Sequence, residues 1–304
     1  MPARTAVACV LGLLACSADD QPGSRLEPMG AVSGAFTITE GAAWFSSGDG
    51  AIRHLELATG AVEMFGTIDP AATDLSVIDD RAYWTYSDHL ERCGRLYVTT
   101  PDRVERTGPE DGLCWSLIGS FERRLIVRQR ASPSSIGETI IATYDVETQE
   151  LAIVHRFFSS ERVRLVDHQL VIVESGVARI VDLRTGRTVQ IPIKRTAPFW
   201  MVPTEDDGLV WLENDVLIEQ HEKGGPFEIA TVSPSTIELG RAGSVWTALE
   251  ETDDTTDLLR IDGAGRAHRW PVSGAVDASL VHDDAYWFTT VDETSGSTLW
   301  RFGP

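Results

Sequence analysis

Acidic side chains are concentrated in two segments near the end of the chain, and they could supply oxygen ligands for a metal ion. Glu250 to Asp257 (EETDDTTD) contains five carboxylates, and Val291 to Ser297 (VDETSGS) adds two more. Ca²⁺ and Mg²⁺ prefer such oxygen ligands. The candidate ligands are Glu250, Glu251, Asp253, Asp254, Asp257, Asp292 and Glu293. The EF-hand pattern with its glycine at the sixth position is absent, so solvated acidic loops are favoured and no cofactor is expected.

Two cysteines are available for a disulfide bond. Of the four in the chain, Cys9 and Cys16 belong to the first sixteen residues, which leaves Cys93 and Cys114. Two cysteines cannot complete a structural zinc site, and no histidine stands at a CxxC-like spacing from them. We therefore expect a Cys93–Cys114 disulfide in an oxidising compartment, with free thiols or a metal pair as alternatives.

Pairs of aspartate and histidine recur along the chain and have the residue types of acid/base catalysis. They are Asp79-Asp80, Asp167-His168, Asp206-Asp207 and His282-Asp283-Asp284. Each precedes a bulky apolar run by the same few residues, which is typical of a repeated hairpin turn. We therefore interpret them as structural, and no GxSxG, Walker or HExxH motif offers another active site.

A repeat of about forty residues determines where all these side chains lie. Short β-rich runs recur with a large apolar residue at their centre, and their spacings are 40, 42, 46, 39, 35 and 41 residues. The central residues are Trp44, Trp84, Ile126, Ile172, Trp211, Trp246 and Trp287. This period is that of one four-stranded propeller blade. We predict an all-β fold, a single seven-bladed β-propeller of antiparallel blades, with six or eight blades as the alternative.

The last blade is one strand short, because the chain ends soon after SGSTLWRF. An open ring would leave an exposed sheet edge, so a strand from roughly Leu26 to Val32 is expected to close blade seven. In such a ring the A–B and C–D turns share one face, and the B–C loops and D–A crossovers share the other, around the channel mouth. Cys93 and Cys114 both map to that second face on neighbouring blades, as a disulfide requires.

The first sixteen residues are typical of an export signal. Arg4 precedes an apolar run from Ala6 to Leu14 that is too short to span a bilayer. Leu13-Leu14-Ala15-Cys16 resembles the bacterial lipobox, which implies a lipid on Cys16. The expected organisation is a signal peptide at 1–15, a lipidated cysteine and flexible tether at 16–28, and a propeller domain at 29–304. An ordinary cleaved signal or a buried N-terminal strand is the alternative.

The repeat units resemble those of known propeller families. Ala43-Trp44-Phe45, with Ile52-Arg53 and the run Ala58 to Val62 (ATGAV), resembles the repeat of virginiamycin B lyase and NHL/SMP-30-like propellers. Tyr83-Trp84-Thr85 resembles the YWTD repeat. The lyase resemblance implies a Mg²⁺-assisted enzyme with a catalytic histidine, and the lactonase-like one implies carboxylates and an asparagine around a divalent metal. Asn214 is the only asparagine, and no His and Glu match the lyase pattern.

The net charge of −20 opposes binding to nucleic acid or to anionic lipid headgroups. The predicted function is therefore that of an exported, lipid-anchored, monomeric propeller that acts as a non-catalytic binding or scaffold protein of the bacterial cell envelope. Its partner is expected to be an envelope protein or glycan on the B–C/D–A face, and the membrane is contacted through the lipid only. Ser17 is not acidic, which favours the outer membrane. The alternative is a divalent-metal-dependent lyase or lactonase at the channel mouth, with Ca²⁺ or Mg²⁺.

Overall fold

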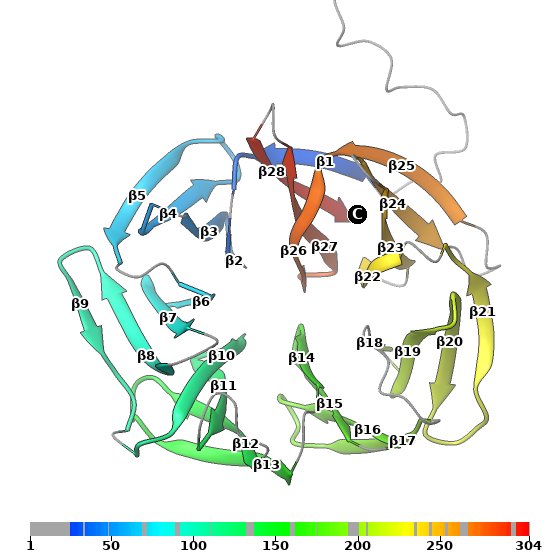
Figure 1. The fold of residues 1–304 in the computed structure, drawn as a ribbon, viewed down its shortest axis with the longest axis horizontal. Helices are drawn as coiled ribbons and strands as arrows, with labels where there is room; N and C mark the ends of the chain where they lie inside the picture. Colours follow the sequence, from blue (N-terminus) through cyan, green and yellow to red (C-terminus); the bar gives the residue numbers. More distant parts are fainter. Residues whose placement is uncertain are drawn as a thin grey trace, which may run out of the picture.

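The computed structural model describes residues 25–303 except 33, 48, 69–71, 89–91, 110, 132–136, 159–161, 175, 194–200, 205, 234–235, 243–244, 253–254, 262–266 and 293–295. The described chain forms seven four-stranded antiparallel sheets arranged in a ring (Figure 1). The predicted seven-bladed propeller is therefore confirmed. No described segment is a helix that is long and apolar enough to cross a membrane.

The strands of each blade follow one another from the centre of the ring outward (Figure 1). Blade 1 comprises β2 (Phe36–Thr39), β3 (Ala42–Ser47), β4 (Ala51–Glu56) and β5 (Val62–Thr67). Blade 2 comprises β6 (Asp74–Ile78), β7 (Arg81–Asp88), β8 (Arg92–Thr100) and β9 (Arg103–Arg106). Blade 3 comprises β10 (Cys114–Phe121), β11 (Arg124–Arg130), β12 (Glu138–Asp145) and β13 (Leu151–Phe158). Blade 4 comprises β14 (Arg162–Val166), β15 (Gln169–Glu174), β16 (Val177–Asp182) and β17 (Thr188–Pro192). Blade 5 comprises β18 (Met201–Pro203), β19 (Gly208–Glu213), β20 (Val216–His221) and β21 (Phe227–Thr231). Blade 6 comprises β22 (Thr236–Ala242), β23 (Val245–Thr252), β24 (Thr255–Ile261) and β25 (Ala267–Ser273).

Blade 7 combines the two ends of the described chain. It contains β26 (Ala275–His282), β27 (Ala285–Asp292) and β28 (Gly296–Gly303), and β1 (Arg25–Gly30) pairs with β28 as the outer strand. Arg25 lies opposite Gly303, and Pro28 lies opposite Trp300. A proline is tolerated there because an outer strand has a free edge. The predicted closure by an N-terminal strand is confirmed, although β1 begins inside the segment that was expected to be tether.

The predicted hairpin turns owe their shape to backbone that few residues adopt. Asp79, Asp80, Asp283 and Asp284 all have positive φ values, between 48° and 57°. Each pair joins the first two strands of its blade in a two-residue turn, in which both residues must be left-handed. Aspartate tolerates this conformation better than most side chains. These carboxylates therefore shape the turns, as the sequence indicated.

The hydrophobic core consists of clusters that lie between neighbouring blades. Trp44 and Ile52 of blade 1 pack with Leu75 and Trp84 of blade 2 in one such cluster. Trp84 is 1% exposed, stacks on Tyr97 and donates a hydrogen bond from Nε1 to Thr99 Oγ1 at 2.9 Å. All seven predicted central residues lie on the second strand of their blades. The central residues of the repeat thus supply side chains that pack between neighbouring blades.

Candidate functional site

The ring surrounds a channel with a volume of about 940 Å³. Its described lining comes mainly from the first strands of blades 1, 2, 3, 4 and 7, which are β2, β6, β10, β14 and β26. We name the two faces of the ring by their connections. The mouth face carries the B–C loops and D–A crossovers, including Ala131 and Asn214, and the turn face carries the A–B and C–D turns, including Asp284 and Thr59. The channel runs between these faces.

Arginines line the part of the channel nearest the mouth face. Arg128 and Arg130 lie at the end of β11, just before the B–C loop of blade 3, and both line the cavity. They share one side of the strand because side chains alternate. Gln129, between them, points to the other side and donates a hydrogen bond to Asp111 Oδ2 at 2.9 Å. Alternation along β11 therefore places two guanidinium groups together in the channel.

The environment of Arg128 is unfavourable for positive charge. Burial lowers the pKa of Arg128, the neighbouring charge of Arg130 lowers it further, and the carboxylate of Asp74 acts in the opposite direction. Among the residues that the structure describes, the Nε atoms of Arg128 and Arg130 are buried without a hydrogen-bond partner. Guanidinium does not lose its proton in proteins, so both charges persist. Among the described residues, Arg128 and Arg130 thus gather positive charge near the mouth of the channel, in a protein whose net charge is −20.

Carboxylates line the opposite end of the channel. Glu122, Asp167 and Asp283 belong to A–B turns, and all three contribute to the lining. Near the mouth, Asp74 is held by hydroxyl groups, since Thr85 Oγ1 donates to its Oδ2 at 2.8 Å. Arg184, in the C–D turn of blade 4, also lines the turn-face end, which therefore carries charges of both signs, whereas Arg128 and Arg130 gather two positive charges near the mouth face.

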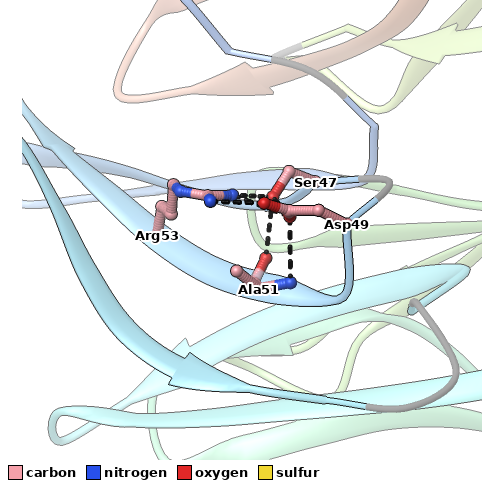
Figure 2. Close-up of polar contacts among 4 residues, drawn as sticks. All are labelled: Ser47, Asp49, Ala51 and Arg53. Carbon is pink, nitrogen blue, oxygen red and sulfur yellow. Dashed lines mark hydrogen bonds and ion pairs between the residues drawn. The ribbon is translucent and has the colours of Figure 1, made fainter.

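A polar network shapes the mouth face at the B–C hairpin of blade 1 (Figure 2). Asp49 accepts hydrogen bonds from the Ala51 backbone N–H at 3.2 Å and from Arg53 Nη1 at 2.9 Å. The Ser47 hydroxyl also donates to Asp49, and Arg53 donates to Ser47 Oγ. The hydrogen bonds from Arg53 and then Ser47 hold the pKa of Asp49 well below its ordinary value of 3.8. Asp49 is thus ionised at neutral pH and neutralised by Arg53.

The acidic segment of blade 6 differs from the predicted loop. Glu250 and Glu251 belong to β23 and Asp257 to β24, so the connection shrinks to residues 253–254. Glu250 is 2% exposed, and its Oε1 accepts a hydrogen bond from the Ser233 backbone N–H at 2.9 Å. Arg269 forms ion pairs with both Glu250 and Asp257. Glu250 and Asp257 are thus paired with the same arginine, whose positive charge disfavours a cation there.

The other predicted ligands are only partly within the described chain. Asp292 ends β27, whereas Asp253, Asp254 and Glu293 lie outside the described residues. Among the described residues, the set of groups close enough to share a metal ion is a different one: Asp206, Glu219 and His221, with ligand atoms within 4.8 Å of one another. The predicted Ca²⁺ or Mg²⁺ site therefore stays a prediction.

The Asp206–Glu219–His221 set lies at the turn face of blade 5. Asp206 is in the A–B turn, and Glu219 and His221 are near the end of β20. His221 Nδ1 lies 3.6 Å from Asp206 Oδ2, and its Nε2 lies 3.0 Å from Glu219 Oε1. Burial raises the pKa of Glu219. Sequence reasoning missed this set because strand pairing brings Glu219 and His221 to the turn that contains Asp206. The available signal was the run Glu-Gln-His, whose spacing places the glutamate and the histidine on one side of a strand.

The structure describes only one of the two cysteines of the predicted disulfide bond in full. Cys114 begins β10, is buried and is disulfide-bonded. Cys93 belongs to β8, but its side chain lies outside the described residues, as does Cys16. A Cβ added at Gly94 would come within 2.1 Å of the Trp115 carbonyl oxygen, so β8 and β10 approach closely beside both cysteines. The Cys93–Cys114 pairing stays a prediction that this approach supports.

Comparisons with known proteins define the class but no family. No family model matches the chain, and no curated protein matches it. The solved structure of polysaccharide lyase Uly1 matches with a TM-score of 0.63 at 11% identity, covering 89% of each chain. BamB from Moraxella catarrhalis matches with a TM-score of 0.53 at 16% identity, covering 90% of this chain and 85% of that one.

The WD40 repeats of RRP9 match with a TM-score of 0.57 at 7% identity, covering 91% of this chain and 96% of that one. At such low identities these likenesses establish the fold alone. The chain is a seven-bladed β-propeller, and neither the resemblance to the virginiamycin B lyase, NHL/SMP-30-like and YWTD repeats nor the lipoprotein assignment is confirmed by them.

Proposed function

We propose that this chain is an exported β-propeller, anchored in the bacterial cell envelope by a lipid on Cys16, that binds an envelope protein or glycan through its mouth face without catalysing a reaction. The outer membrane is the proposed location. The lipobox-like run that ends at Cys16 supports the anchor, and the propeller fold supplies a rigid ring that presents loops.

The direction of β1 is the observation that carries this proposal. β1 is antiparallel to β28, and Arg25 lies opposite Gly303, at the end of β28 that is remote from the B–C loop. The chain therefore enters the propeller at the turn face. A tether that starts at a lipidated Cys16 would reach the ring on that side, which leaves the mouth face turned away from the membrane and open to a partner.

The metal-dependent lyase or lactonase is the less favoured function. It needs carboxylates that converge at the channel mouth, whereas Glu250 and Asp257 of blade 6 are engaged by Arg269. Arg128 and Arg130, which line the channel near its mouth, repel divalent cations. Similarity to a polysaccharide lyase at 11% identity concerns the fold only.

Photo-crosslinking in intact cells tests which face binds a partner. A crosslinking amino acid is placed at Ala131 or Asn214 on the mouth face, and at Thr59 or Asp284 on the turn face as matched controls; all four are exposed. We expect the same discrete adduct from Ala131 and Asn214, and none of that mass from Thr59 or Asp284. Adducts that form only from the turn face, or from no position, would contradict the proposal.

A further inference from the structure

The burial of Arg128 and Arg130 is energetically unfavourable, and the fold alone does not explain it. They lie side by side on β11, each with a buried Nε that has no hydrogen-bond partner among the described residues. Burying an unpaired charge is expensive, and a second like charge nearby adds to the cost. Asp74 is near enough to act on Arg128, but its Oδ2 already accepts hydrogen bonds from Thr73 and Thr85.

The other charged groups of the lining do not remove this imbalance. Glu122, Asp167 and Asp283 lie at the A–B turns, at the far end of the channel, and Arg184 lies in a C–D turn at the same end. Arg164, on β14, adds a further positive charge to the lining, and its Nη1 donates to the Leu239 carbonyl oxygen at 2.8 Å. Among the described residues of the lining near the mouth, Arg128 and Arg130 place two positive charges beside the single carboxylate of Asp74, and a bound anion would neutralise the excess.

We infer that the channel is a binding site for a small molecule bearing an oxyanion, a carboxylate or a phosphate group, which Arg128 and Arg130 hold near the mouth. The planar guanidinium group matches both kinds of oxyanion with paired N–H donors. The channel volume of about 940 Å³ lies in the range of small-molecule sites. Of the two lysines of the chain, Lys223 is not among the residues of the lining, and Lys194 lies outside the described residues. This inference goes beyond the proposed function, which concerns a macromolecular partner on the mouth face.

Isothermal titration of the purified full-length chain at low ionic strength tests the inference. The probes are inorganic phosphate and glucuronate, which separate the two oxyanion sources, and glucose is the neutral control. We expect at least one oxyanion to bind, glucose not to bind, and Arg128→Gln with Arg130→Gln to weaken binding by about tenfold or more. The matched control, Arg103→Gln with Arg187→Gln, removes the same charge from exposed positions outside the channel and should change affinity by less than about twofold.

A second measurement avoids dependence on the folding of the variants. Phenylglyoxal modifies accessible arginines, and mass spectrometry of the wild-type chain reports each site. The bound oxyanion should slow modification of Arg128 and Arg130 but not of Arg103 or Arg187. Equal affinities for the channel and control variants, no binding of either oxyanion up to about 10 mM, or protection absent at Arg128 and Arg130 would each overturn the inference. Oxyanion binding that fails while mouth-face crosslinks persist would refute this site and leave the proposed function standing.

Discussion

Asp49 shows how one carboxylate can organise a hairpin at the mouth face. It accepts hydrogen bonds from Ser47, Ala51 and Arg53, and each is made to the ionised form (Figure 2). Because these contacts stabilise the charged state, they lower the pKa of Asp49 in the folded protein. The unfolded chain binds a proton more readily, so folding is linked to pH at this residue.

Asp49→Asn is expected to lower the melting temperature at neutral pH. The stabilisation by the wild-type carboxylate is complete above its ordinary pKa of 3.8 and is lost as pH falls toward the lower pKa of the folded state. The gap between wild type and variant should therefore narrow steadily below about pH 4. Thermal melts across this range measure it, with Asp284→Asn, at an exposed turn, as the control. A gap that stays constant down to about pH 2 would contradict the account.

Lipid attachment is a prediction about a single residue. Growth of the expressing cells with an alkyne-labelled fatty acid should label the wild-type protein, and Cys16→Ala should abolish the label because the acylated thiol is gone. Cys9→Ala is the matched control, since it removes the other cysteine of the leader and should keep the label. Labelling that survives in Cys16→Ala would show that the anchor is elsewhere or absent.

At the scale of strands, much of the fold could be read from the sequence. Alternation and the recurring central residues located the second strand of every blade, including the two blades in which isoleucine replaces tryptophan. Hairpin turns were equally visible, because left-handed backbone selects Asp, Asn and Gly. The acidic segment Glu250 to Asp257 was misjudged as a loop because strand pairing, a tertiary effect, outweighed its polar composition.

Close packing between blades was not visible in the sequence. A Cβ at Gly240, on the inner strand of blade 6, would lie 2.3 Å from the ring of Tyr286 in blade 7. Gly240 has no positive φ, so space rather than backbone conformation requires glycine there. A glycine in the middle of a strand gives no local sign of this contact.

Gly240→Ala is therefore expected to destabilise the protein by about 1–3 kcal/mol, because the methyl group forces Tyr286 or the backbone to move. Gly225→Ala is the matched control: it also has no positive φ, and nothing lies within 4 Å of its added Cβ. Urea or thermal unfolding of the two variants measures the difference. Equal stabilities would show that Gly240 of blade 6 and Tyr286 of blade 7 are packed less tightly than the 2.3 Å approach indicates.

At the scale of the whole molecule, strand counting predicted the ring, its closure and its two faces. The arginine-lined mouth could not be predicted in the same way. Arg128 and Arg130 stand in RLIVRQR, an ordinary strand sequence, and their meeting with Asp74 of blade 2 in one channel depends on how the blades are arranged around the axis. The charge composition suggested the opposite sign of charge, because a net charge of −20 gives no indication of a local excess of positive charge.

The pairing of β1 with β28 is the contact on which the rest of the account depends. It closes the ring around the channel, and it sets the face from which the tether leaves. Hydrogen–deuterium exchange of the intact chain tests it directly, through the peptide that covers residues 25–30. We expect slowed exchange there, comparable to that of outer strands such as β5 and β17, because the β1 amides that face β28 are hydrogen-bonded to it. Exchange at the rate of an unstructured peptide would show an open ring and would contradict both the channel and the orientation of its mouth.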